Sequence, residues 1–256
     1  MKMIISDLDG TLLKEKKQSL DLKTLNLIEK LLDKGFYFAV ATGRQYPNAY
    51  RMFGKLAENI IYICENGSLI ISKHKILYRG KIEMNLCKDI VKSALENKST
   101  ELMLSGIMTS FINPRNYYFY DLVANRMQNN VLVLEDLMDF DETCVKVSIY
   151  QKDKISSADE KKWKGKYENK LTVAKSSEKW LDFVPLGTDK GAALERALKY
   201  FKISKRDCVV FGDQDNDIEM LKLIPNSYAM SCGSYGAKKI AKDIVSDVDI
   251  VLERML

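Results

Sequence analysis

The chain begins with a short apolar run that ends in two closely spaced carboxylates. Residues 3–6 read MIIS, and Asp7, Asp9, Gly10 and Thr11 follow this predicted buried strand almost at once. Carboxylates in such a place are costly unless a cation or a proton neutralises them. Gly10 and Thr11 predict a turn that bends the backbone over a ligand. The pattern indicates a metal-assisted aspartate nucleophile with a second aspartate as its acid and base.

Predicted strands and helices alternate in the first and last thirds of the 256 residues, but not in the middle third. There the predicted strands are unevenly spaced and hairpin-like, which is typical of an α+β domain. Regular alternation predicts a parallel sheet covered by helices on both faces. We therefore expect a doubly wound, Rossmann-like α/β core from residues 1–81 and 186–256. Residues 82–185 are expected to form an inserted α+β domain.

Three local patterns predict structure next to the expected core strands. Asn66-Gly67 follows the apolar strand of residues 60–64 and is a hairpin signal. Residues 47–57 predict a helix. Thr188 is a plausible N-cap for a helix that starts at the next residue.

The basic charge of the chain is mild and spread out. The formal net charge is +5, and the densest basic and aromatic segment is residues 161–167. This segment is either a surface for nucleic acid or phosphate, or a helix whose Trp163 and Tyr167 dock inward. We favour the helix, because a nucleic-acid-binding domain usually has a pI above about 9. With His74 as the one histidine, a His-based triad is improbable and a His-rich metal site is excluded.

Cysteine usage and hydropathy indicate the compartment. The five cysteines are scattered and never form a CxxC pair, so we expect reduced, buried thiols. No apolar run approaches the roughly 18–20 residues of a membrane span. The chain enters its first strand at once, which leaves no room for a secretory signal before it. We expect a cytoplasmic protein with no membrane or nucleic-acid partner.

Three further polar segments lie where the core should bind ligands. Residues 42–44 and residues 212–217 each adjoin the end of a predicted strand, and Lys190 begins a predicted helix. In open parallel sheets, ligands bind at the carboxyl ends of the strands. A lysine at a helix start opposes the helix dipole, which favours a functional reason for Lys190. We expect these segments to meet Asp7.

Four segments of the chain, taken in order, match a known set of motifs. They are DLDGT at residues 7–11, ATGR at 41–44, DKG at 189–191 and GDQDND at 212–217. Together they resemble the four signature motifs of the haloacid dehalogenase superfamily. The long insertion between the second and third resembles the type IIB α+β cap of the Cof-like sugar-phosphate phosphatases. The resemblance spans essentially the whole chain.

The resemblance implies a Mg²⁺-dependent phosphomonoesterase that hydrolyses small phosphorylated metabolites, such as sugar phosphates, through an aspartyl-phosphate. It implies that Asp7 attacks phosphorus. Asp9 would protonate the leaving alcohol and then deprotonate the hydrolytic water. Because Mg²⁺ prefers oxygen ligands, the implied metal ligands are Asp7, the main-chain carbonyl of Asp9, Asp213 and Asp217.

The resemblance also implies a set of phosphate-binding residues, namely Thr42, Gly43, Lys190 and Asn216. Thr42 would donate a hydroxyl hydrogen bond to the phosphoryl oxygens, and Lys190 would hold the phosphate charge and keep the carboxylates ionised. Read from the residues alone, Thr42 could instead cap the following helix. Arg44 could contact substrate or the cap, or form a surface salt bridge.

Two other functions would use part of the same residue set. A phosphomutase or phosphotransferase of the family needs Asp7 and Asp9 as well. A non-catalytic phosphometabolite-binding protein gains nothing from a second acid/base carboxylate, so Asp9 argues against it. In the predicted cap, residues 115–118 (RNYY) are a candidate substrate lining, against the alternative of an ordinary buried cluster.

Two segments depart from the family pattern. Residues 231–234 read SCGS where relatives commonly have Gly-Asn-Ala, and we expect this segment beside the site. Residues 14–17 read KEKK, an unusually basic loop for which we predict a solvated turn.

Overall fold

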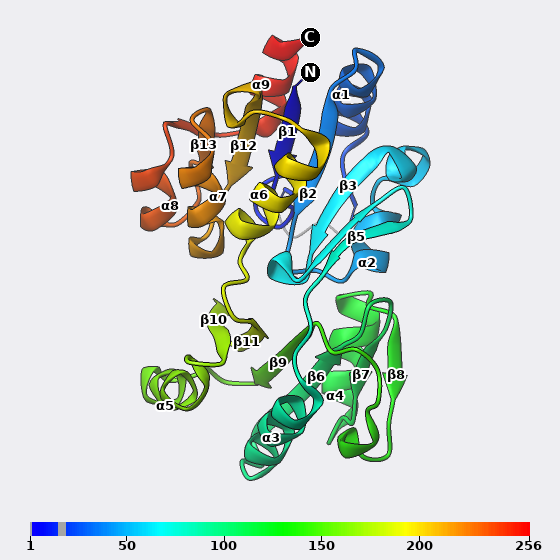
Figure 1. Cartoon of the computed structure of the whole chain (residues 1–256), viewed down its shortest axis with the longest axis vertical. Helices are drawn as coiled ribbons and strands as arrows, with labels where there is room; N and C mark the ends of the chain where they lie inside the picture. Colours follow the sequence, from blue (N-terminus) through cyan, green and yellow to red (C-terminus); the bar gives the residue numbers. More distant parts are fainter. Residues whose placement is uncertain (1, 15–18) are drawn as a thin grey trace. The chain divides into compact units, whose positions relative to one another are not determined.

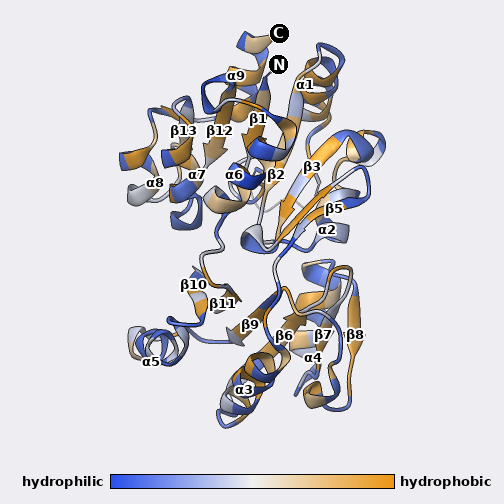
Figure 2. Ribbon diagram, viewed as in Figure 1, coloured by the Kyte–Doolittle hydropathy of each residue, from blue (hydrophilic) through white to orange (hydrophobic). Residues whose placement is uncertain are grey.

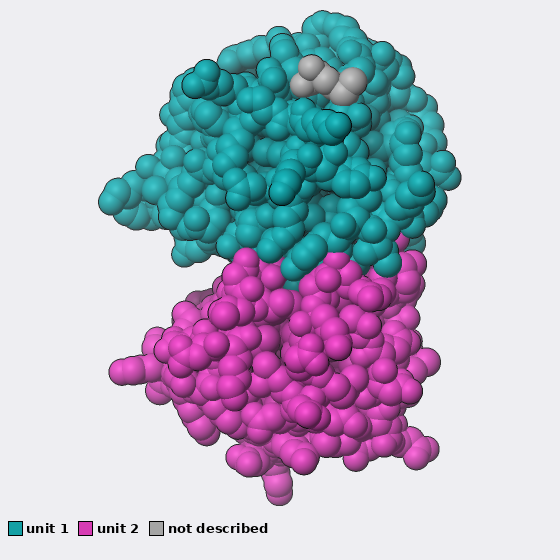
Figure 3. All heavy atoms as spheres, viewed as in Figure 1, with its two compact units in different colours: residues 1–42, 49–78, 189–256 teal, residues 43–48, 79–188 magenta. Residues whose placement is uncertain are grey.

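The structure is a computed structural model, and it describes residues 2–14 and 19–256. Most of the basic loop, residues 15–17, therefore lies outside the described residues. The described chain divides into two compact units (Figure 3). Unit 1 contains residues 1–42, 49–78 and 189–256, and unit 2 contains residues 43–48 and 79–188.

Unit 1 is built on one mainly parallel sheet, which has eight strands within the described residues (Figure 1). β1 lies between β2 and β12 and pairs with both in parallel. β3 and β13 extend the parallel pairing on either side, and β4 turns back antiparallel to β3. In spatial order the strands are β14 (Asp243–Val245), β13 (Ser227–Met230), β12 (Cys208–Gly212), β1 (Met3–Ser6), β2 (Tyr37–Ala41), β3 (Ile60–Cys64), β4 (Leu69–Ser72) and β5 (Lys75–Arg79).

Apolar residues of the central strands form the core of unit 1. Figure 2 shows β1, β3 and β12 as hydrophobic segments, as expected for strands covered on both faces. On one face, Ile5 and Val210 pack with Leu194 and Met220 of two covering helices. Each such side chain contributes roughly 1.5–3 kcal/mol when fully buried. The helices of unit 1 include α1 (Leu22–Asp33), α6 (Lys190–Phe201), α7 (Ile218–Leu223), α8 (Tyr235–Ile240) and α9 (Val248–Met255).

The first and last helices of the chain pack against each other. The Thr24 hydroxyl of α1 donates a 2.9 Å hydrogen bond to Asp249 of α9. Lys14 forms ion pairs of 2.7 Å with Asp247 and 3.2 Å with Asp249. Lys14 is the residue of the predicted basic loop, residues 14–17, that the structure describes. It is held by acidic partners, although we predicted a solvated turn.

Unit 2 is a mainly antiparallel sheet of six strands, all in described residues. β11 and β6 both pair antiparallel with β9, and β8 pairs in parallel with β7. In spatial order the strands are β10 (Leu171–Ser177), β11 (Trp180–Pro185), β9 (Lys146–Gln151), β6 (Thr100–Ser105), β7 (Ser110–Ile112) and β8 (Val131–Val133).

Helices cover the unit 2 sheet on both faces. α3 (Met84–Leu95) and α5 (Ser157–Tyr167) pack on one face with the larger apolar cluster. Trp163 and Tyr167 of α5 both contact Phe183, so the prediction that they dock inward is confirmed. α4 (Tyr117–Tyr120) packs on the other face through Phe119.

Several helical segments differ from the predictions. The helix predicted over residues 47–57 is split into α2 (Tyr46–Arg51) and the 3-10 helix η1 (Gly54–Asn59), with Gly54 at a positive φ of 50°. β14 and α9 were not predicted. In the described chain, five further short helical segments are η2 (Glu65–Gly67), η3 (Asp121–Arg126), η4 (Leu137–Asp139), η5 (Lys205–Asp207) and η6 (Asp215–Asp217). Among the described residues, no helix is long and apolar enough to cross a membrane.

Candidate active site

The sequence motifs meet at one edge of the unit 1 sheet. Asp7 directly follows β1, Thr42 follows β2 and Asp213 follows β12. Because these three strands are parallel and adjacent, their carboxyl ends lie at the same edge. Lys190 is the first residue of α6. The expectation that these segments meet Asp7 is confirmed for Lys190, Asp213 and Asp217.

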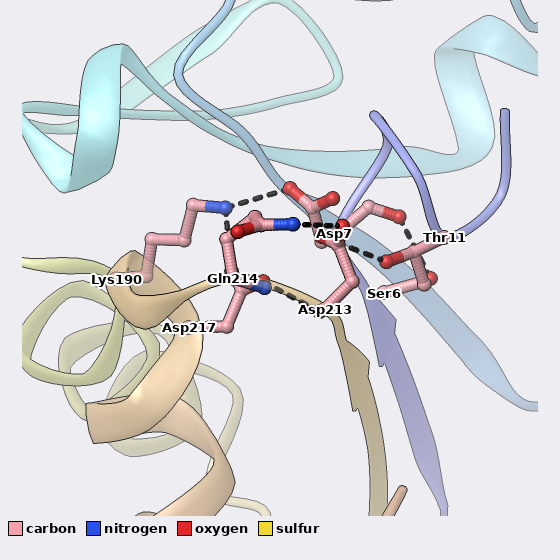
Figure 4. A network of polar contacts seen from close by, with 7 residues as sticks. All are labelled: Ser6, Asp7, Thr11, Lys190, Asp213, Gln214 and Asp217. Carbon is pink, nitrogen blue, oxygen red and sulfur yellow. Dashed lines mark hydrogen bonds and ion pairs between the residues drawn. The ribbon is translucent and has the colours of Figure 1, made fainter. Parts of the chain in front are cut away.

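The centre of the site is a buried lysine between two aspartates (Figure 4). The Lys190 Nζ lies 2.6 Å from Asp7 Oδ1 and 2.6 Å from Asp217 Oδ1. All three side chains are at least 94% buried, since their exposed fractions are 1%, 6% and 0%. Buried charges of this kind persist only when they are paired and hydrogen-bonded. These two carboxylates are shielded from water. Lys190 therefore supplies the stabilisation of their charge that water would supply at the surface.

Burial and mutual repulsion shape the ionisation of the acidic cluster. Burial raises the pKa of Asp7 well above its ordinary value, Lys190 lowers it, and Asp217 and Asp213 raise it. Burial also raises the pKa of Asp213. Burial alone would lower the pKa of Lys190, but Asp217 and Asp7 outweigh it, so the pKa of this lysine is raised. The site therefore carries more negative charge than one lysine neutralises.

Asp213 is oriented by its neighbours on both sides. Gln214 Nε2 donates to Asp213 Oδ2 at 2.9 Å, and the Thr11 hydroxyl lies 3.5 Å from Asp213 Oδ1. Gly10 has a φ of +84°, and a Cβ placed there would lie 2.4 Å from Asp213 Oδ2. A side chain at residue 10 would thus be both strained and in collision with the carboxylate. The predicted turn after Asp9 is confirmed, and glycine is required in it.

The cluster fits a hard divalent cation. Among the described residues, Asp7, Asp213 and Asp217 each offer a carboxylate oxygen within 4.8 Å of the others. Asp7 Oδ2 is buried and has no hydrogen-bond partner among the described residues. An orphaned carboxylate oxygen beside other carboxylates is what an oxygen-binding metal such as Mg²⁺ would satisfy.

Asp217 differs from the other two acidic residues, because both its oxygens already have partners. Its Oδ1 accepts from Lys190, and its Oδ2 accepts from the backbone N–H groups of Asp213 and Gln214 at 2.8 and 3.0 Å. The Asp217 side chain thereby holds the turn η6 in shape. Its contacts assign it to positioning Lys190 and Asp213, whatever further role it has with a metal.

The remaining predicted site residues are placed as follows. Asp9 is exposed while Leu8 before it is fully buried, so the two aspartates of the first motif lie in different environments. An exposed carboxyl group can exchange protons with the surrounding water. Asn216 lies half-buried within η6, beside Asp217.

Thr42 extends the end of β2 and is fully buried. Its backbone N–H donates to Ile63 at 2.8 Å, and its carbonyl accepts from Asn66 at 3.1 Å. α2 begins at Tyr46, so Thr42 is not the N-cap of that helix. Arg44 donates to Asn48 Oδ1 at 3.0 Å, within the segment that belongs to unit 2.

A strained turn beside Thr42 was not predicted as part of the site. The Asn66-Gly67 hairpin is confirmed, because β4 pairs antiparallel with β3. Glu65 and Asn66 both adopt positive φ values, 52° and 55°. Such conformations cost about 1–3 kcal/mol each outside glycine and cluster at functional sites. The Asn-Gly pair in the sequence indicates a turn at this position. The sequence does not show that the turn forms a hydrogen bond with Thr42.

Two further predictions near the site have different outcomes. The N-cap of α6 is Asp189, whose side chain accepts from the Ala192 N–H at 2.7 Å, so the prediction of Thr188 was wrong. The segment of residues 231–234 does lie beside the site, since the Ser234 N–H donates to the Asp213 carbonyl at 2.7 Å. Gln214 was also missed as the residue that orients Asp213.

Arg115 of the candidate cap lining bonds to its own unit. Its guanidinium donates to the Leu95 carbonyl at 3.2 Å, and its backbone N–H donates to Glu101. Its side chain is exposed. These contacts tie together the ends of two elements and give Arg115 a structural role.

Known proteins resemble this chain over nine-tenths or more of its length. The 5-amino-6-(5-phospho-D-ribitylamino)uracil phosphatase YbjI of Escherichia coli is 23% identical over 90% of this chain and 85% of its own. YitU of Bacillus subtilis, named for the same activity, is 25% identical over 93% and 90%. The solved HAD subclass IIB sugar phosphatase BT4131 has a TM-score of 0.83 at 18% identity and covers 100% of this chain and 99% of that one, which shows a shared fold.

The match to a family model agrees with these likenesses. The model of the haloacid dehalogenase-like hydrolases matches residues 4–250. This range includes every residue of the acidic site, all of unit 2 and most of unit 1. The resemblance inferred from four short motifs and the expected α/β fold are thereby confirmed, and the chain belongs to the haloacid dehalogenase-like hydrolases.

Proposed function

We propose that this protein is a Mg²⁺-dependent phosphomonoesterase that acts on small phosphorylated metabolites such as sugar phosphates. The observation that carries the proposal is the state of Asp7. One oxygen of this buried carboxylate is held 2.6 Å from Lys190, and the other has no partner among the described residues. A nucleophile has to be fixed in orientation, as the ion pair with Lys190 fixes Asp7, and the oxygen without a partner leaves this carboxylate able to bind both a metal and phosphorus.

In the proposed reaction an oxygen of Asp7 attacks phosphorus and the alcohol leaves, which gives an aspartyl-phosphate. Asp9 donates its proton to the departing alkoxide oxygen and then takes a proton from the water that hydrolyses the aspartyl-phosphate. The exposed position of Asp9 suits both transfers. The products are the free alcohol and inorganic phosphate, and Asp7 is regenerated.

The other residues of the site bind and orient. Lys190 would hold the phosphoryl charge as well as the Asp7 carboxylate, and Thr42, Gly43 and Asn216 would bind phosphoryl oxygens. A bound Mg²⁺, held by Asp7, the Asp9 carbonyl and Asp213, with Asp217 beside them, would neutralise charge on the phosphoryl oxygens.

We further propose that unit 2 is the inserted cap domain and that it contributes to substrate choice. The relatives named above support a small-molecule substrate. Two of them are phosphatases of a phosphorylated ribityl compound, and BT4131 is named a sugar phosphatase.

The test is phosphate release from a panel of small phosphate esters, with and without Mg²⁺. Asp7→Asn should abolish release, and Asp215→Asn is the matched control. Asp215 lies in the same sequence motif as Asp213, but its carboxylate is exposed and accepts from Ser234 at 2.6 Å. Release that needs both Mg²⁺ and Asp7 supports the proposal. Failure to release phosphate even from an activated aryl phosphate would overturn it, and transfer to an acceptor sugar without release would indicate a mutase.

A further inference from the structure

The turn η2, residues 65–67, has a backbone conformation that few chain segments adopt. Its three residues have positive φ values in succession, 52° for Glu65, 55° for Asn66 and 97° for Gly67. Glycine adopts such values readily, but a residue with a side chain keeps them only where the surrounding structure imposes them. All three residues are buried. The contacts of η2 therefore indicate what this conformation serves.

Joining β3 to β4 does not by itself require such a turn. Connecting segments usually run over the protein surface, and hairpin loops of four residues are most often built around a type I turn, which has negative φ values. The connection in this chain, residues 65–68, is buried and contains the three positive φ values. Its conformation is better explained by the two segments of unit 1 that it contacts.

One side of the turn is bonded to the end of β2. The Asn66 N–H donates to the Thr42 carbonyl at 3.1 Å. The Thr42 N–H donates to the Ile63 carbonyl at 2.8 Å, which continues the parallel pairing of β2 with β3. The backbone of Thr42 is therefore held on its N–H side by β3 and on its carbonyl side by η2.

Another side of the turn lies against the start of α6. A Cβ placed at Gly67 would lie 2.4 Å from the Asp189 carbonyl oxygen and 3.0 Å from the Cβ of Ala193. The same carbonyl accepts the Ala193 N–H at 3.0 Å, a hydrogen bond of the first turn of α6. The backbone of Gly67 thus sets how closely α6 approaches η2, at the peptide that leads into Lys190.

A second close contact holds the same end of α6. A Cβ placed at Gly191 would lie 2.7 Å from the carbonyl carbon of Glu219 and 2.8 Å from its oxygen. Gly191 lies in the first turn of α6, and Glu219 lies in the first turn of α7. Two backbone segments, each in contact through a glycine, therefore confine the start of α6.

Lys190 lies between these two contacts in the chain. Its Nζ lies 2.6 Å from both Asp7 and Asp217 (Figure 4). The lysine is the first residue of α6, so a shift of the helix start would carry its side chain with it. Short, charge-assisted contacts of this length leave little room for such a shift.

We propose that η2 is a positioning element of the proposed active site. It holds the start of α6, and with it Lys190, at a fixed distance from the end of β2. This inference rests on the proposed phosphatase function, in which Lys190 and Thr42 both bind the phosphoryl group. Gly67 is a positioning residue in this proposal, because it acts through the backbone of Asp189 and contacts no reacting group.

The first experiment uses Gly67→Ala, with kcat and KM measured on para-nitrophenyl phosphate and Mg²⁺. The added Cβ would lie 2.4 Å from the Asp189 oxygen, whereas ordinary contacts begin at 3.4 Å, so the start of α6 must move by about 1 Å. A misplacement of that size can cost on the order of 100-fold in rate. We expect kcat to fall roughly 10–100-fold, with a smaller change in KM.

Gly54→Ala is the matched control. Gly54 also has a positive φ, 50°, but a Cβ there would meet nothing within 4 Å. Both substitutions place alanine in a left-handed conformation, so both should lower the melting temperature, and Gly54→Ala should keep its kcat. Gly191→Ala is a second variant, since it displaces the same helix start without a positive φ and should also lower kcat. Kinetics are measured at a temperature at which thermal unfolding shows each variant to be folded.

The second experiment follows the position of Lys190 without catalysis, by labelling lysines with an acylating reagent and peptide mass spectrometry. Lys190 is 1% exposed and Lys205 is 46% exposed, so Lys190 should react far more slowly in the wild type. Its labelling relative to Lys205 should rise at least about threefold in Gly67→Ala and in Gly191→Ala, because a displaced lysine opens more often to solvent. Gly54→Ala should leave the relative labelling unchanged.

The outcomes separate the two proposals. If the wild type releases no phosphate from any ester, the phosphatase function fails, and the labelling alone decides whether η2 holds Lys190. If the wild type is active and Gly67→Ala has the same kcat as Gly54→Ala, the turn is structural and the inference is overturned. A fall in kcat without increased labelling of Lys190 would also overturn it. If Gly67→Ala does not fold, Gly191→Ala carries the same two tests.

Discussion

Replacing Lys190 with methionine tests the central claim about the site, that a buried cation holds two carboxylates in place. The substitution keeps an unbranched side chain, one atom shorter than lysine, and removes its charge. Lys190 lies 2.6 Å from an oxygen of Asp7 and of Asp217, and none of the three side chains is more than 6% exposed. Removing one partner from a buried ion pair typically costs about 3–5 kcal/mol. For a domain of this size that corresponds to a fall in melting temperature of roughly 6–20 °C.

Lys205→Met is the matched control. Lys205 Nζ also lies 2.6 Å from a carboxylate, that of Glu195, but the two side chains are 46% and 60% exposed. Exposed pairs contribute little to stability, so we expect this variant to melt within about 2 °C of the wild type. Both variants are measured by thermal unfolding in the presence of a chelator, which excludes metal binding as a second variable.

The pH dependence of Lys190→Met adds a second check. Lys190 lowers the pKa of Asp7, so its removal should raise that pKa further. A carboxyl whose pKa is raised by folding favours the folded state at low pH, and that contribution is lost as pH rises through the raised value. The gap in melting temperature between wild type and Lys190→Met should therefore be largest near pH 8 and shrink toward pH 5. A variant no less stable than Lys205→Met at pH 8 would refute the reasoning.

Three further predictions follow from the same geometry. Mg²⁺ should raise the melting temperature, and the size of this rise should shrink from pH 7 to pH 5. The reason is that the pKa values of Asp7 and Asp213 are raised, so protons compete with the metal for these carboxylates as the pH falls. A rise in melting temperature that does not depend on pH would contradict metal binding by the carboxylates. Gly10→Ala should lose at least about tenfold in kcat/KM, because its Cβ would lie 2.4 Å from Asp213 Oδ2. Gly35→Ala is the control and should keep its activity, because Gly35 also has a positive φ, +83°, but a Cβ there would meet nothing within 4 Å. Equal losses in the two variants would show that backbone strain alone matters. A thiol reagent should label one cysteine in the folded protein and five after unfolding, since Cys232 is exposed and the other four are buried; labelling of Cys208, whose pKa burial raises to about 11, would contradict the packing of β12.

The core site was predictable because its residues sit in local patterns. Asp7 follows an apolar strand and Asp213 follows another, and parallel strands bring such ends together whatever the rest of the fold. Lys190 stood out because a lysine opposes the dipole at a helix start. Each of these signals is confined to a few neighbouring residues.

Other features depend on pairings that a sequence does not display. The split of the helix predicted over residues 47–57 follows from the positive φ of Gly54, which a helical hydropathy pattern conceals. Thr188 and Asp189 are both good N-caps by type, and the local backbone decides between them. The hydrogen bond from the Ser148 hydroxyl to Asp182 joins residues on two strands of unit 2 and becomes visible only with their register.

The position of β1 between β2 and β12 has a consequence for the order of folding. β2 begins at Tyr37, whereas β12 begins at Cys208, some 200 residues after β1. At about 5–20 residues per second, the ribosome needs roughly 10–40 s to make that stretch. During this time one edge of β1 lacks its native neighbour, while residues 79–188, which carry most of unit 2, are already made. The nascent chain thus holds the Asp7 carboxylate without Lys190 or Asp213 until its last quarter emerges, and the hydrolytic site is among the last parts of the molecule to form.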